Sequence, residues 1–74
     1  MQSIALSIYL DSEFGVPREM QGAGTSLENP YVYDEVAREI KAMARRGLVE
    51  IVGEKVVQRA GEPLIDRLAF RRLR

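Results

Sequence analysis

Cysteine and histidine are both absent from this chain of 74 residues. Without cysteine, no disulfide can stabilise so small a domain, so an apolar core or a partner chain has to do so. A structural zinc site built from cysteine and histidine is excluded, as is catalysis by a histidine base or a thiol nucleophile. A cytoplasmic location fits a chain without disulfides. We therefore expect no metal, no cofactor and no enzymatic activity; an enzyme that uses only carboxylate, tyrosine or serine side chains is the less favoured alternative.

Net charge is also absent, because eleven basic residues balance eleven acidic ones. The chain as a whole therefore has no field that would hold nucleic acid or an acidic membrane. The charges are unevenly distributed: residues 1–39 contain seven acidic and two basic residues, whereas residues 40–74 contain four acidic and nine basic ones. Attraction between the two halves within the fold is the simpler interpretation. A basic surface that binds an anionic partner is the alternative.

Long apolar runs are missing as well, so no segment approaches the length that spans a bilayer. The first ten residues lack the basic flank and small-residue cleavage site of a signal peptide. Hydrophobic residues make up 46% of the chain and charged residues 30%, which is typical of a globular domain. Residues 1–74 are therefore expected to form one small domain without membrane contact.

The N-terminal segment SIALSIYL, residues 3–10, has its largest aliphatic side chains at every second position. This period predicts a strand with one buried side, and a short buried helix is the alternative. In the following residues 11–29, VPREM is expected to form one helical turn that begins at Pro17, where the missing N–H costs nothing. Gly22 and Gly24 then allow the chain to turn.

The loop GAGTS, residues 22–26, has two glycines of a nucleotide-binding loop. It lacks the third glycine of the dinucleotide fingerprint and the lysine of a P-loop, so we interpret it as a turn that leads into a helix. Asp11 and Glu13 lack the further ligands and the glycine of a calcium loop. Glu35 and Glu39 are expected to lie on a solvated helix face.

Residues 29–47 predict a helix. Asn29 is a good N-cap and Pro30 a good first residue, and apolar residues recur at spacings of three and four. Asp34 and Arg38 are four residues apart and are expected to form an ion pair. Gly47 is expected to end the helix in a left-handed conformation.

Residues 48–58 contain two short β-branched runs around Gly53, Glu54 and Lys55, which predicts a β-hairpin. Residues 61–74 predict a final helix with Pro63 near its start and arginines at its end. The alternative is a third strand, since Leu68, Phe70 and Arg72 alternate along the chain.

The predicted fold is α+β. A three-stranded antiparallel sheet, made of the N-terminal strand and the hairpin, packs against one long helix and a short C-terminal helix. The expected core consists mainly of aliphatic residues from all four elements: Ile4, Leu6, Ile8, Val36, Ile40, Met43, Val49, Ile51, Val57, Leu64 and Leu68.

The stretch AMARRGLVEIVGEKVV resembles the recognition helix and wing of winged-helix DNA-binding domains, and the similarity covers about residues 33–58. In those domains the helix enters the major groove and basic residues contact phosphate. The resemblance implies a pair of earlier helices. It also implies that the phosphate contacts are Lys41, Arg45, Arg46 and Lys55.

The favoured hypothesis is a small non-enzymatic interaction or regulatory module that self-associates or docks on another protein. An outer strand of the sheet could pair with another chain, and the C-terminal arginines could surround the contact: Arg67, Arg71, Arg72 and Arg74. Nucleic-acid binding through the basic C-terminal half is the second hypothesis.

Overall fold

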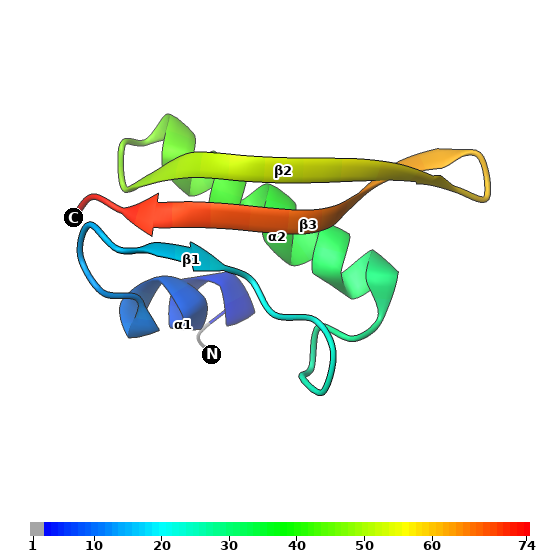
Figure 1. Cartoon of the computed structure of the whole chain (residues 1–74), viewed down its shortest axis with the longest axis horizontal. Coiled ribbons are helices and arrows are strands. Elements are labelled where there is room, and N and C mark those ends of the chain that lie inside the picture. The colour runs from blue at the N-terminus through cyan, green and yellow to red at the C-terminus, as the bar shows by residue number, and fades with distance from the viewer. Residues whose placement is uncertain (1–2) are drawn as a thin grey trace.

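The computed structural model describes residues 3–74 and shows two helices and a three-stranded antiparallel sheet (Figure 1). The elements in chain order are α1 (Ile4–Asp11), β1 (Pro17–Glu19), α2 (Pro30–Arg45), β2 (Val49–Arg59) and β3 (Glu62–Arg72). The strand order is β1-β3-β2, so the last strand lies in the middle. The predicted α+β class and the three-stranded antiparallel sheet are confirmed, but of the segments predicted as strands only residues 48–58 form one, β2, and other segments supply β1 and β3.

The N-terminal segment is a helix, and the predicted strand at residues 3–10 is wrong. The Ser3 hydroxyl caps this helix by accepting a hydrogen bond from the Leu6 N–H at 3.0 Å. Apolar residues occupy nearly every position of α1, so its sequence satisfies the period of a strand and that of a helix equally well. The helix buries Ala5 and Tyr9, which are four residues apart, and leaves Ile4 42% exposed.

Strand β1 replaces the helical turn predicted at residues 16–20. Its three residues pair antiparallel with Ala69, Phe70 and Arg71 of β3. Pro17 begins the strand, a position at which proline is tolerated in an edge strand because no ladder hydrogen bond is needed from its nitrogen. The Met20 N–H continues the ladder by donating to the Leu68 carbonyl oxygen at 2.8 Å.

Helix α2 has the predicted limits. The Asn29 side chain accepts hydrogen bonds from the Tyr31 and Val32 N–H groups, as expected of an N-cap. Gly47 follows the helix with a φ of 77°, which confirms the left-handed stop. The predicted ion pair between Asp34 and Arg38 is present at 3.0 Å.

The hairpin turns at Ala60 and Gly61, not at residues 53–55. Both turn residues have positive φ, 53° and 79°, as a two-residue hairpin of type I′ requires. Gly53 lies within β2, where the register with β3 shifts by one residue between Ile51 and Gly53. The glycine marks a β-bulge, which explains why it resembles a turn in the sequence.

The C-terminal segment is strand β3, so the predicted helix at residues 61–74 is wrong and the alternative of a third strand is right. The alternation of Leu68, Phe70 and Arg72 in the sequence is the period-two pattern of this strand. Non-local pairing decides the outcome: β3 is hydrogen-bonded to β2 on one side and to β1 on the other.

The core lies between α2 and the sheet, with α1 at one side of it (Figure 1). Six of the eleven predicted core residues are buried: Val36, Ile40, Met43, Val49, Leu64 and Leu68. Three others are half-buried: Ile8, Ile51 and Val57. Ile4 and Leu6 are exposed and the prediction for them is wrong. Phe70 and Ile65, which were not predicted, are among the largest fully buried side chains, because β3 is central.

Candidate interaction surfaces

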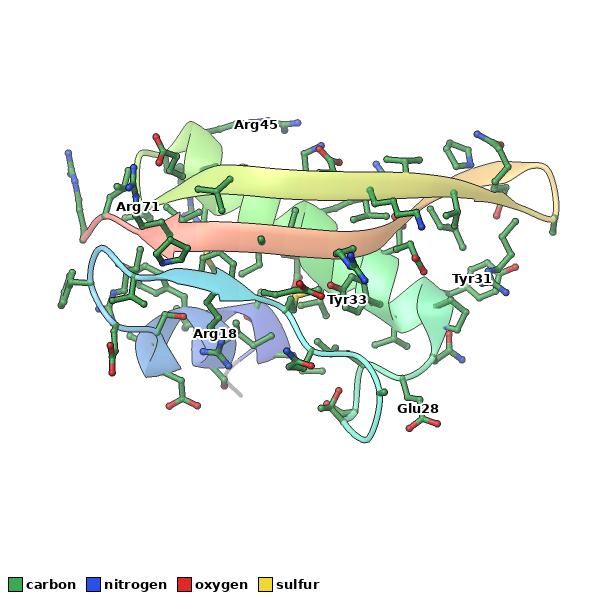
Figure 2. The ribbon with its side chains drawn as sticks, in the orientation of Figure 1. Arg18, Glu28, Tyr31, Tyr33, Arg45 and Arg71 are labelled. Carbon is green, nitrogen blue, oxygen red and sulfur yellow. The ribbon has the colours of Figure 1, made fainter. Side chains whose placement is uncertain are left out.

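The predicted basic residues lie in three separate places. Five occupy the end of the molecule where α2 ends and β3 ends, since the Leu73 N–H donates to the Leu48 carbonyl oxygen; these are Arg45, Arg46, Arg71, Arg72 and Arg74. Figure 2 shows Arg45 and Arg71 toward this end and Glu28 and Tyr31 toward the other. Lys55 and Arg67 are opposite each other in the β2–β3 ladder. Lys41 lies on α2. The structure therefore does not assemble the eight residues into one basic face.

Several of these cations are already neutralised within the fold. Lys41 forms an ion pair with Glu54 at 2.8 Å, and Arg67 forms one with Glu19 at 3.3 Å. Arg71 pairs with Glu50, its neighbour on β2. Of the four ion pairs among residues 3–74, only that between Arg67 and Glu19 joins the acidic half of the sequence to the basic half. Attraction between the halves is therefore a minor feature of this fold.

Arg72 is a structural residue that holds α1 against the sheet. Its guanidinium carbon lies 4.4 Å from the ring centroid of Tyr9 and 4.2 Å from that of Phe14, which places the cation between two aromatic faces. The same guanidinium donates to the carbonyl oxygens of Leu10 and Ser12. Because these carbonyls end α1, Arg72 supplies the cation that the last turn of the helix lacks.

Arg45, Arg46, Lys55 and Arg74 remain as exposed cations. None of them forms an ion pair within 4.0 Å with any residue from 3 to 74. Arg45 and Arg46 end α2, whereas Lys55 lies seven residues into β2, about 20 Å from its start at the rise of a strand. Arg45, Arg46 and Arg74 therefore lie at one end of the molecule and Lys55 lies apart from them, so the four cations do not form one continuous basic face.

The glycine-containing loop is closed by its own hydrogen bonds. The Glu28 carboxylate accepts from the Gly24 N–H at 3.0 Å, and the Thr25 hydroxyl accepts from the Leu27 N–H at 3.0 Å. Leu27 is 4% exposed and anchors the loop in the core. The loop turns the chain toward α2, as expected. Among residues 3–74, no group of three or more acidic side chains is placed to hold a metal ion.

A groove of about 490 Å³ lies beside this loop, between the end of β1, the start of α2 and β3. At its base the Tyr33 hydroxyl donates to the Met20 carbonyl oxygen at 2.7 Å and accepts from the Leu68 N–H at 3.0 Å. Burial raises the pKa of Tyr33, and Glu19 and Asp66 add to the increase, although the hydrogen bond from Leu68 opposes it. The phenol is thus held neutral and joins α2, β3 and the segment after β1.

Asp34 also links α2 to β3, through the backbone of Ile65. Its carboxylate accepts hydrogen bonds from the Ile65 N–H at 2.8 Å and from the Arg38 guanidinium. Desolvation raises the pKa of Asp34, but the hydrogen bonds from Arg38 and Ile65 outweigh this effect and leave the pKa below its usual value. Arg38 also donates to the Pro63 carbonyl oxygen at 3.2 Å. Side chains of α2 therefore cover the part of the β3 edge that β1 does not reach.

The exposed apolar surface of α1 was missed from the sequence. Leu6 and Leu10 are 39% and 52% exposed and, four residues apart, lie on one face of the helix. Ser3 and Ser7, also exposed and four apart, lie beside them. We call these four residues the α1 outer face. Residues 3–10 contain no charged side chain, and this absence is the signal that could have indicated a contact surface.

No protein-family model, curated protein or solved structure matches this chain. Within residues 3–74, neither helix is long and apolar enough to cross a membrane.

Proposed function

We propose that this chain is a non-enzymatic interaction module that binds another protein chain through the α1 outer face. The observation that supports this proposal is the mismatch between the composition of α1 and its burial. A helix that is apolar on all sides is normally covered on all sides, yet the domain covers α1 only at Ala5 and Tyr9, with Ile8 partly buried. Exposed apolar surfaces of this kind are typical of protein contacts.

The apolar surface continues beyond the helix. Phe14 is 63% exposed and Leu73 is 48% exposed. Phe14 lies at the C-terminal end of α1, because the Arg72 side chain that stacks on it also contacts Leu10 and Ser12, and Leu73 follows Arg72 in the chain. The α1 outer face is thus flanked by the aromatic side chain of Phe14 and by the exposed Arg74, whose carbonyl oxygen accepts a hydrogen bond from the Tyr9 hydroxyl; aromatic residues and arginine are favoured at protein interfaces.

Affinity capture from the native host with matched baits tests this function. The wild-type chain is compared with Leu10→Gln, which removes an exposed apolar side chain from α1, and with Val52→Gln, which does the same on β2, where Val52 is 46% exposed. We expect the captured proteins, including the chain itself, to be lost with Leu10→Gln and retained with Val52→Gln. Equal recovery with all three baits would contradict the proposal.

A second candidate is DNA binding of the winged-helix kind, which the order of the elements supports. A helix precedes β1, and α2 is followed by a two-stranded hairpin whose last strand lies between the other two. The resemblance noted at residues 33–58 then extends to α1 and β1. Of the two earlier helices it implies, one has no counterpart here, since residues 20–29 form a loop.

Charge weighs against this second candidate. In the resemblance, the helix that corresponds to α2 contacts the major groove, but the exposed side chains of α2 include Glu35 and Glu39, which repel phosphate. Fluorescence anisotropy with a duplex oligonucleotide at low salt distinguishes the two functions. DNA binding requires an affinity that falls steeply with salt, decreases in Arg45→Glu/Arg46→Glu and increases in Glu35→Gln/Glu39→Gln.

A further inference from the structure

We infer that the partner of the α1 outer face is a second copy of this chain, bound so that the two α1 helices pack antiparallel about a two-fold axis. This inference rests on the proposed function and specifies its partner. Homodimers with two-fold symmetry use the same surface on both subunits, so the surface has to complement itself. The α1 outer face meets this condition in shape and in charge.

The shape argument comes from the alternation of large and small side chains. Leu6 and Leu10 form a ridge, and Ser3 and Ser7 form the adjacent shallow row. In an antiparallel pair centred between residues 6 and 7, Leu10 of one copy lies opposite Ser3 of the partner subunit. Leu6 then lies opposite Ser7 of the partner subunit. Each leucine meets a small side chain, which lets the two helices approach closely.

The charge argument comes from the ends of α1. The first turn of this helix has no acidic residue that would offset the positive end of its dipole. Asp11 is the last residue of α1 and is exposed. In the antiparallel arrangement Asp11 of each copy reaches the N-terminal end of the other helix. The second copy thereby supplies the anion that the first turn lacks, and residues 3–10 contribute no charge that would repel it.

The exposed edge of β2 is the rival site for a second copy, and its residues fit less well. Antiparallel pairing of two identical edges about a two-fold axis places one residue opposite itself. Val52 and Val56 are 46% and 50% exposed there, but an axis at Glu54 or Lys55, between them, brings like charges together. The bulge at Gly53 further interrupts a regular edge.

Sedimentation velocity over a range of protein concentrations is the primary test. We expect the wild type to dimerise and Leu6→Gln and Leu10→Gln each to raise the dissociation constant about tenfold to a hundredfold, because each change removes two half-exposed leucines from the symmetric interface. Val52→Gln and Val56→Gln are the matched controls and should leave it unchanged. Asp11→Asn should weaken the dimer about threefold or more, and this effect should diminish with added salt.

Single cysteines report the orientation, since the chain has none of its own. A short bifunctional maleimide should cross-link Ser7→Cys, which lies near the two-fold axis, but not Ser3→Cys, whose two copies are about 10 Å apart along the helix axis. Cross-linking of both variants would indicate a parallel pair and overturn the antiparallel arrangement. Circular dichroism confirms that each variant is folded.

The outcomes separate the two proposals. A wild type that stays monomeric at high concentration overturns the inference, even if Leu10-dependent capture of another protein sustains the proposed function. A dimer that weakens with Val52→Gln and not with Leu10→Gln overturns it in favour of the β2 edge. If the wild type is monomeric and also captures no protein, both proposals fail.

Discussion

The two helices differ in how completely the domain accounts for their sequences. The apolar stripe of α2 is matched by the sheet, and its buried residues recur at spacings of three and four from Tyr33 to Met43. Helix α1 is apolar on almost every side, but the domain buries only two of its residues. A helix whose apolar surface equals its buried surface stabilises the fold. A helix whose apolar surface exceeds its buried surface leaves apolar side chains exposed, and these can contact another protein chain.

The largest expected effect is a loss of folding stability caused by a substitution in α2, the helix whose apolar stripe packs on the sheet. Ile40 is fully buried beneath the sheet, so Ile40→Ala should lower the free energy of unfolding by about 2–5 kcal/mol. A loss of that size is a large share of the stability of a domain this small. Urea denaturation followed by circular dichroism measures it. A loss below about 1 kcal/mol would show that the α2–sheet layer is not the main source of stability.

The next effect concerns the attachment of α1. Arg72→Lys keeps the charge but cannot stack between Tyr9 and Phe14 while donating to two carbonyl oxygens. We expect a loss of about 2 kcal/mol, from the charged hydrogen bonds and the cation–π contacts. Amide hydrogen exchange should accelerate in α1 more than in α2. Uniform acceleration across both helices would mean that α1 does not detach as a separate unit.

The contrast between the helices also explains what the sequence could predict. The limits of α2 were predictable because they depend on local signals: the Asn29 cap, Pro30 after it and Gly47 at the end. The strand or helix state of α1 was not predictable, since its largely apolar sequence fits the period of a strand and that of a helix equally well. Strand β3 depends on pairing with β1 and β2, which no local pattern reveals. Gly53 resembled a turn because bulges and turns both favour glycine.

The candidate surface was harder to predict than the fold. The sequence directed attention to the basic residues, but Lys41, Arg67 and Arg71 are neutralised by neighbours that only the three-dimensional arrangement brings close. The α1 outer face was missed because Leu6 was assigned to the core. Burial depends on how much surface the rest of the chain can cover, and 74 residues cover little.

Acid should weaken the link that Asp34 makes between α2 and β3. The pKa of Asp34 is lower in the folded state, so its stabilising effect is complete above about pH 4 and is lost as the pH falls through the folded-state pKa. We expect Asp34→Asn to cost about 1 kcal/mol at pH 7 and much less at pH 2. Urea denaturation at both pH values measures the difference. An equal cost at both would show that the charge of Asp34 contributes nothing to the link between α2 and β3.

The smallest change in the free energy of unfolding of the monomer is expected at the α1 outer face. It tests most directly whether α1, unlike α2, has apolar side chains that the fold does not need. Leu6→Ala should change the free energy of unfolding by no more than about 0.5 kcal/mol in dilute solution, because the side chain is already exposed. The wild-type melting temperature should rise with protein concentration, since association stabilises the folded state by mass action, and Leu6→Ala should reduce this dependence. If Leu6→Ala instead destabilises the dilute protein by 2 kcal/mol or more, the leucine supports the monomer, and the two helices differ less than their exposure suggests.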